Sequence, residues 1–209
     1  ALSNQLRGLL AEYGIVLAQG FAKLRSQLPS IIEDGENELT YKARALFQGL
    51  YEEFKKLDER ITEYDKQLAQ EAKTDERCKR LLEIEGIGVI SATALVASIA
   101  DVSVFKNGRQ LSAWVGLVPR QHSSGGKVRL QGISKRGDSY LRRLLIHGGR
   151  AVVKTLKTKE GKRSEWARQL VERVGVNKAA VAIANKNARI VWAMLHRDEK
   201  YRGAVSSSC

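Results

Sequence analysis

Two adjacent hydroxyls, Ser123 and Ser124, precede a pair of glycines in the segment RQHSSGGKVRLQGISKRGDSYLRR, residues 120–143. A serine hydroxyl attacks a phosphodiester only when a base or a metal ion activates it, and nearby cations stabilise the charge that develops on the phosphate. Four basic residues of the segment could supply those cations: Lys127, Arg129, Lys135 and Arg136. From residue types alone, however, Ser-Ser-Gly-Gly is more simply a hairpin turn, and the neighbouring His122 more often a surface residue than a base.

Positive charge is concentrated in the same part of the chain. The 209 residues include 36 Lys and Arg against 23 Asp and Glu, a net charge of +13. Residues 1–75 hold 10 basic and 13 acidic residues (−3), which leaves 26 basic and 10 acidic residues (+16) in 76–209. This asymmetry predicts that the second part binds a polyanion, in the first place nucleic acid. Further phosphate contacts are expected from the helix after the hairpin: Arg142, Arg143 and Arg150.

A second candidate for backbone contact is the segment CKRLLEIEGIGVISATALVASI, residues 78–99. It reads as a short amphipathic helix, a Gly-Ile-Gly turn and a helix rich in small residues, and it resembles a helix-hairpin-helix motif. In such a motif Gly86 and Gly88 would let the chain approach a DNA phosphate, which the amides of the second helix would bind. The same spacing is also compatible with a plain turn between two helices.

The N-terminal part is predicted to be helical and elongated. A first helix over 2–28 is interrupted near Gly14 and Gly20 and ends at Pro29. A second, over about 37–73 with Asn37 or Asp34 as cap, carries a heptad seam with one stutter. The seam needs an apolar partner, which is either the N-terminal helix folded back or the same helix of a second subunit. Its apolar positions are Leu39, Ala43, Leu46, Leu50, Phe54, Leu57, Ile61, Tyr64 and Leu68.

The fold expected from these elements is mainly α: a long coiled-coil helix hairpin, then a helical domain with a helix-hairpin-helix motif and a short β-hairpin. The hairpin has a strand at Lys127–Leu130 after a turn at Ser123–Gly126, and the next helix begins near Asp138 or Ser134 as cap. We expect a coiled-coil segment at 1–75, a DNA-binding domain at 76–200 and a disordered tail at 201–209. The remaining helices are expected at 109–115, 138–157, 164–174 and 177–196.

Composition excludes several classes of protein. No run of about 18 apolar residues could span a membrane, and the N-terminus does not have the pattern of a signal peptide. Cys78 and Cys209 form no CxxC pair, which argues against a disulfide framework and a zinc site. We therefore expect a reducing, cytoplasmic location with no metal bound by this chain.

Three stretches together resemble the insertion sequence 110 family of transposases, also called DEDD transposases. They are LSNQLRGLLAEYGI at the start, LLEIEGIGVISATALVASI, and the region from GLVP through SSGG to GISKRG and the Leu-Arg helix. The resemblance extends to about residue 200. It implies an N-terminal RuvC-like nuclease fold with four metal-binding acidic residues, then a coiled coil, then a transposase domain with a nucleophilic serine.

Carried onto this sequence, the resemblance makes Ser124, directly before Gly125, the expected nucleophile, with Ser123 as the alternative. It implies attack on a DNA phosphodiester, a serine–DNA covalent intermediate and strand exchange without ATP. The chain begins where the coiled coil of the family begins, so Mg²⁺ is expected from the nuclease domain that precedes it, and activity of this chain alone is not expected.

The family also implies partners. DNA is expected first, and a guide RNA second, because some relatives are bridge-RNA-guided recombinases. We also expect a homo-oligomer formed through residues 39–68 and a location at the bacterial nucleoid. The alternative function is a non-catalytic module that binds DNA or a guide RNA and dimerises.

Overall fold

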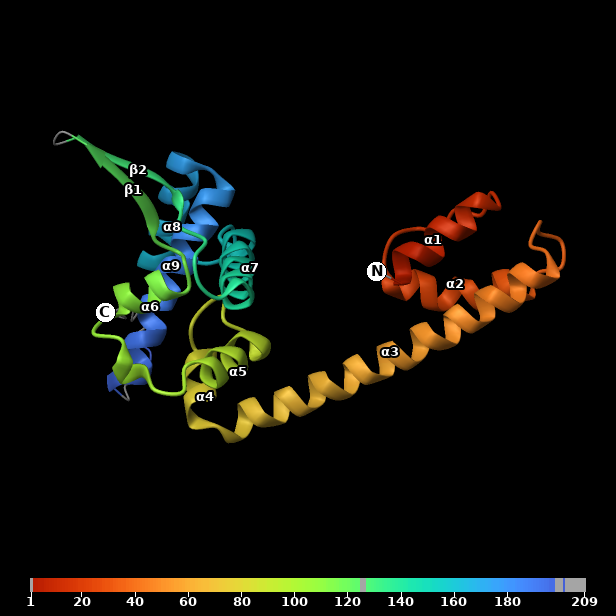
Figure 1. Cartoon of the computed structure of the whole chain (residues 1–209), viewed down its shortest axis with the longest axis horizontal. Coiled ribbons are helices and arrows are strands. Elements are labelled where there is room, and N and C mark those ends of the chain that lie inside the picture. Colours follow the sequence, from red (N-terminus) through yellow and green to blue (C-terminus); the bar gives the residue numbers. More distant parts are fainter. Residues whose placement is uncertain (1, 125–126, 198–200, 202–209) are drawn as a thin grey trace. The chain divides into compact units, whose positions relative to one another are not determined.

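The computed structural model describes residues 2–124, 127–197 and 201, and for residues 122–124, 127, 128 and 130 it describes the backbone only. The chain divides into two compact units, Ala1–Gln67 and Leu68–Cys209, with the boundary inside a long helix (Figure 1). In the described residues the secondary structure is helical apart from one two-stranded antiparallel sheet, which confirms the expected mainly α class. None of the described helices combines the length and the apolar character needed to cross a membrane.

The first unit contains α1 (Leu2–Glu12), α2 (Phe21–Glu33) and the first part of α3 (Tyr41–Thr74). The single helix expected over 2–28 is therefore two helices. The loop between them includes Gly14 at φ 71° and Gly20 at φ 113°, backbone conformations that glycine adopts far more readily than other residues. These two glycines are the interruption that the sequence predicted.

Pro29 lies inside α2, so the expectation that it ends the helix is wrong. A proline has no N–H, and the carbonyl four residues earlier, on Arg25, therefore loses its helical partner. The hydroxyl of Tyr51 on α3 donates to that carbonyl at 3.4 Å. A tertiary contact thus partly replaces the missing hydrogen bond, and α2 continues to Glu33.

The cap of α3 also differs from the expected one. The hydroxyl of Thr40 accepts from the Ala43 N–H at 3.2 Å, in the manner of a helix N-cap. Asn37 closes the preceding loop instead: its amide donates to the Ile31 carbonyl at 2.7 Å and accepts from Arg44 at 2.7 Å. The helix therefore begins at Tyr41, a few residues later than predicted.

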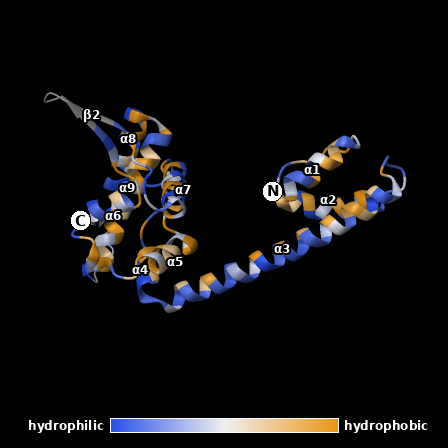
Figure 2. Cartoon of the chain, in the orientation of Figure 1, coloured by the Kyte–Doolittle hydropathy of each residue, from blue (hydrophilic) through white to orange (hydrophobic). Residues whose placement is uncertain are grey.

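The N-terminal half of the heptad seam packs within the chain except at Leu46, which is 55% exposed, whereas the neighbouring Phe47 is buried in its place. Phe47 and Phe54 of α3 are buried against leucines of α1 and α2. Farther along α3, Leu57, Ile61 and Tyr64 are 40%, 59% and 56% exposed. Figure 2 shows α3 as a mostly hydrophilic helix with separate hydrophobic residues along it. The α1–α2 pair therefore covers only the first part of the seam.

The second unit is built around α7 (Ser139–Thr155) and α9 (Val176–Arg197), which pack side by side. Their approach is close: a Cβ on Gly149 would lie 2.3 Å from the Ala180 carbonyl oxygen. Tyr201 also packs on the core of this unit, whereas residues 202–209 of the expected tail lie outside the described residues. The other elements are α4 (Glu76–Leu82), α5 (Val89–Ser98), the 3₁₀ turn η1 (Val102–Val104), α6 (Gly108–Trp114), β1 (Pro119–Ser124), β2 (Lys127–Ile133) and α8 (Lys162–Val174).

Candidate nucleic-acid interface

Strands β1 and β2 form the hairpin that carries the candidate nucleophile. Ser123 and Ser124 end β1 as paired strand residues, so they do not belong to the turn where the sequence placed them. In the antiparallel register Ser124 pairs with Lys127, Ser123 with Val128, and His122 with Arg129. Gly125 and Gly126, between the strands, lie outside the described residues, as do the side chains of Ser123, Ser124 and Lys127.

The base of the hairpin is fixed by two glycines that face other backbone segments. A Cβ on Gly116 would lie 2.0 Å from the Arg136 carbonyl oxygen, and one on Gly137 would lie 1.8 Å from that of Trp114. Both glycines have positive φ. The Ser134 N–H donates to the Val118 carbonyl at 2.8 Å. The chain entering and the chain leaving the hairpin are therefore locked together at its base.

Arg142 reinforces the same region. Its guanidinium donates to the Val115 carbonyl at 3.1 Å, at the C-terminal end of α6, where unpaired helix carbonyls favour a cation. The side chain is half-buried, whereas the other described cations of the predicted set are exposed: Arg129, Lys135, Arg136, Arg143 and Arg150. Arg142 thus supports the base of the hairpin. The exposed members can meet a ligand, although Arg150 also donates to the Asn177 side chain at 3.5 Å.

The helix after the hairpin begins as predicted. The Asp138 carboxylate accepts from the N–H groups of Tyr140 and Leu141 at 2.7 and 2.9 Å. Asp138 is therefore the N-cap of α7. The carboxylate of Asp138, an acidic residue within the basic segment, thus serves to cap this helix.

The Gly-Ile-Gly turn lies between α4 and α5, but its two glycines have different surroundings. Gly86 has φ 86° and faces α7, where its Cβ would lie 2.7 Å from the Gly148 carbonyl oxygen. Gly88 is the N-cap residue of α5, has no side-chain cap and has open space around it. The packing against α7 accounts for Gly86, and Gly88 leaves the N-terminus of α5 open to a ligand.

A polar network behind this turn was not foreseen from the sequence. Asn187 on α9 is fully buried, and its amide donates to the Glu85 carbonyl at 2.9 Å. The guanidinium of Arg163 donates to Asn187 and to the Tyr201 hydroxyl, and lies 3.8 Å from the Glu85 carboxylate. Lys159 pairs with the same carboxylate at 2.8 Å. Arg163 and Lys159 therefore hold the turn against α8 and α9.

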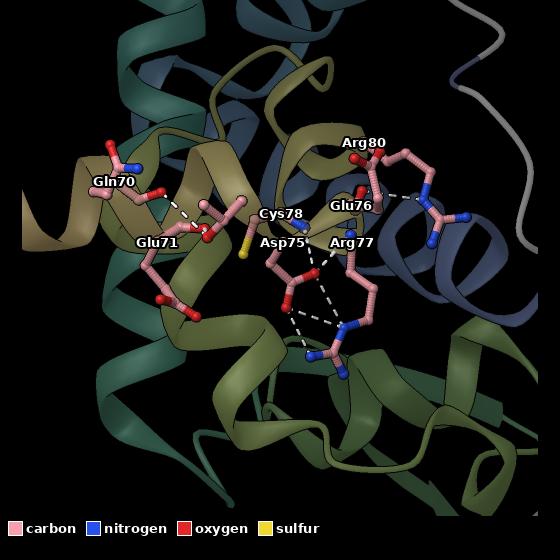
Figure 3. A network of polar contacts seen from close by, with 8 residues as sticks. Gln70, Glu71, Asp75, Glu76, Arg77, Cys78 and Arg80 are labelled. Atoms are coloured by element: carbon pink, nitrogen blue, oxygen red, sulfur yellow. Dashed lines mark hydrogen bonds and ion pairs between the residues drawn. The ribbon is translucent and has the colours of Figure 1, made fainter.

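Figure 3 shows the polar contacts at the start of α4. The Asp75 carboxylate accepts from the Arg77 N–H at 2.7 Å and pairs with the Arg77 guanidinium at 2.7 Å. The side-chain hydrogen bond from Arg77 is the main cause that lowers the pKa of Asp75. The adjacent Cys78 is buried, and burial raises the pKa of its thiol. Asp75 and Arg77 thus stabilise the start of α4, while burial favours the neutral form of the Cys78 thiol.

The chain has several relatives among known proteins. Residues 78–171 match the model of the Transposase IS116/IS110/IS902 family. The chain is 48% identical over 202 residues to the transposase for insertion sequence element IS1111A of Coxiella burnetii, covering 97% of this chain and 56% of that protein. It is 47% identical to a probable family 20 transposase of Pseudomonas aeruginosa, covering 97% and 60%.

A third relative is the transposase for insertion sequence element IS1328 of Yersinia enterocolitica. It is 39% identical over 190 residues, which cover 91% of this chain and 56% of that protein. The chain thus spans somewhat more than half the length of each of these three relatives. The matched region contains the Gly-Ile-Gly turn, the hairpin and α7, which are the elements of the candidate interface. The chain belongs to the IS116/IS110/IS902 family of transposases.

Proposed function

We propose that this chain binds DNA as part of a transposase and that the hairpin presents Ser124 to a DNA phosphodiester. The pairing register carries the proposal. Ser124 pairs with Lys127 and His122 with Arg129, whereas Ser123 pairs with Val128. Because faces alternate along a strand, positions 122, 124, 127 and 129 share one face of the ribbon. This register favours Ser124 over Ser123, since only the face of position 124 combines a hydroxyl with two cationic positions.

In the proposed step, the Ser124 oxygen attacks the phosphorus of a DNA phosphodiester and releases its proton to a base. The bond to the leaving strand breaks, and the freed end takes up a proton as a hydroxyl. The new serine phosphodiester keeps the energy of the broken bond, so a hydroxyl of another strand can displace Ser124 without ATP. Lys127 and Arg129 would stabilise the charge that develops on the phosphate oxygens.

Divalent metal would activate the hydroxyl and offset phosphate charge. In the described parts of the chain, no three His, Cys, Asp or Glu side chains gather in a group suited to a metal ion. We therefore derive no step through a metal ligand of this chain. We propose that Mg²⁺ is held by another domain or polypeptide that meets the hairpin on DNA.

The Gly-Ile-Gly turn would add a contact that is independent of DNA sequence. The free N–H groups at the first turn of α5 suit a phosphate, and Gly88 leaves space for it. As a helix-hairpin-helix contact, this end of α5 would position the strand without reading its bases. Gly88→Val would block the approach, and DNA affinity should fall equally for unrelated sequences.

The decisive experiment compares the two serines in a transposase that contains this chain. Ser124→Ala should abolish the covalent protein–DNA adduct on denaturing gels and abolish recombination, while DNA affinity is retained. Ser123→Ala, the matched control, should keep both activities. If Ser123→Ala abolishes the adduct and Ser124→Ala does not, the nucleophile is Ser123. If neither variant changes adduct formation or recombination, the hairpin serines are not the nucleophile.

We also propose that α3 pairs with α3 of a second copy. The exposed residues Leu57, Ile61 and Tyr64 recur at heptad spacing beyond the part covered by α1 and α2. Light scattering should report a dimer that Ile61→Asp converts to a monomer. Thr62→Asp, on the adjacent exposed position, is the control and should remain dimeric. A monomeric wild-type chain would contradict the pairing.

The alternative is a non-catalytic module that binds DNA or a guide RNA. Its support is the positive charge of the second unit without a metal-binding group in the described residues. Direct competition between duplex DNA and structured RNA for the chain separates these ligands. An adduct formed by this chain with Mg²⁺ and DNA would eliminate the alternative.

A further inference from the structure

We propose that Arg109, Lys186 and Arg189 form a second phosphate-binding surface, separate from the hairpin, that takes phosphodiester groups of a nucleic-acid strand. We call it the α6–α9 surface. None of its residues belongs to the hairpin, the Gly-Ile-Gly turn or α7. The inference rests on the proposed function only in assuming that the ligand is nucleic acid.

The first observation is an open pocket of about 380 Å³ between α6 and α9. It is lined by Asn107, Gly108, Arg109, Arg189, Trp192 and Ala193, with no acidic residue among them. Gly108 creates the close approach, because its Cβ would lie 2.9 Å from the Cα of Arg189. The two helices thereby bring two exposed arginines to the same hollow.

The second observation is that these two arginines have no partner among the described residues. Within residues 2–124, 127–197 and 201, neither guanidinium makes a hydrogen bond or an ion pair. Arg163, by contrast, is paired with the Glu85 carboxylate and donates to Asn187. A guanidinium without an internal role is available for an external anion, and its planar fork matches the oxygens of a phosphate.

The third observation concerns Lys186, three residues before Arg189 on α9. Its ammonium lies 3.9 Å from the centre of the Trp166 ring on α8. Burial lowers the pKa of Lys186, and the charges of Arg163 and Arg189 lower it further. Like charges held together destabilise one another until an anion approaches. The α6–α9 surface is thus arranged to gain from a bound phosphate.

The position of the surface suggests how a strand would lie. The pocket is at the N-terminal end of α6, and β1 begins a few residues after its C-terminal end. A seven-residue helix is about 10 Å long. Ser124 lies at the far end of β1, which adds about 17 Å of strand. Each DNA strand carries a phosphate about every 3.4 Å, so a duplex of about one helical turn is long enough to reach from the hairpin end to the α6–α9 surface.

The test uses the full chain and a fluorescent DNA duplex, with anisotropy measured over a series of salt concentrations. Arg109→Gln with Arg189→Gln should weaken binding about tenfold and lower the slope of log affinity against log salt by about 2. The loss should be equal for two unrelated sequences, as expected for phosphate contacts. Replacing Arg189→Gln in the double variant by Arg189→Lys keeps one of the two charges, and the salt slope should move back towards the wild-type value.

The matched control is Arg168→Gln. Arg168 is exposed on α8, and two residues after Trp166 it lies about 200° around that helix, away from Lys186. The Arg168→Gln substitution removes one positive charge, as Arg189→Gln does, but it should leave the slope of log affinity against log salt unchanged. Glutamine keeps the Cβ and Cγ of each arginine, and equal urea midpoints would verify that the variants are folded.

The outcomes separate this inference from the proposed function. If the wild type binds DNA and the double variant binds with the same salt slope, the proposal of the α6–α9 surface is wrong, while the proposed function still stands. If the wild type shows no salt-dependent binding, both proposals fall. If inorganic phosphate binds the wild type but not the double variant, while duplex affinity is unchanged, the pocket is a free-anion site and the inference is again overturned.

Discussion

Gly148 of α7 and Gly86 of the turn between α4 and α5 meet through their backbones. A Cβ built on Gly148 would lie 1.8 Å from the carbonyl oxygen of Gly86, and the reverse distance is 2.7 Å. Neither position accepts a side chain without separating the two segments. The two glycines, which have no side chains, therefore let the turn pack directly on the backbone of α7.

Gly148→Ala should destabilise the second unit by about 3 kcal/mol, because the added methyl group must displace backbone and not a flexible side chain. Urea unfolding followed by circular dichroism measures the effect. Gly49→Ala is the control, since Gly49 lies inside α3 with nothing within 4 Å of its Cβ position. It should stabilise by about 0.5–1 kcal/mol. Equal stability of Gly148→Ala and wild type would refute the close contact.

Asn187→Ala should cost about 3 kcal/mol. The change leaves the Glu85 carbonyl and one side of the Arg163 guanidinium without their partner in a fully buried site. Asn177→Ala removes an exposed amide whose contact with Arg150 is 3.5 Å long, and it should change stability by less than about 0.5 kcal/mol. Similar urea midpoints for the two variants would contradict a structural role of the network.

Cys78 should react slowly with a thiol dye in the folded protein, because its side chain is buried and burial raises the pKa of the thiol. A Cys209→Ser background isolates this thiol. The rate should rise to that of a free thiol in urea. Since the unfolded thiol ionises first as pH rises above 9, the contribution of Cys78 to stability should fall there. Fast labelling without urea would contradict this burial.

The contribution of Asp75 to the free energy of unfolding should change at acidic pH. Its pKa is lowered in the folded state, chiefly by the hydrogen bond from the Arg77 side chain. Its contribution is thus present above the ordinary value of 3.8 and is lost as pH falls through the lower folded pKa. Asp75→Asn should be less stable than wild type at neutral pH, and the difference should shrink in acid. A difference that stays constant from neutral to acidic pH would exclude this ionisation.

Features set by neighbours in the sequence were predictable. Asp138 was one of two residues named as the cap of α7, and it accepts from the two N–H groups that such a cap should hold. Gly14 and Gly20 interrupt the first helix because they adopt positive φ. The mainly α class with one hairpin followed from helical spacing and from a short alternating run after two glycines.

Features set by distant partners were not. Nothing near Arg163 in the sequence indicates that Glu85 and Asn187 hold it, and it resembles the other cations of its segment. Pro29 lies within a helix, and the Tyr51 hydroxyl that meets the freed Arg25 carbonyl at 3.4 Å comes from 22 positions later in the sequence. Arg109 and Arg189 were overlooked because only the packing of Gly108 brings them together.

Tyr201 anchors the chain after α9 to the second unit, and this contact bears on where a label can be fused. Its N–H donates to the Glu83 carboxylate at 3.0 Å, and its ring lies 5.8 Å from the Arg163 guanidinium. A reporter fused directly after Arg197 would replace this tyrosine and leave Arg163 with fewer contacts behind the Gly-Ile-Gly turn. A junction placed after Tyr201 keeps that anchor, so fluorescent or affinity labels are best joined there or beyond.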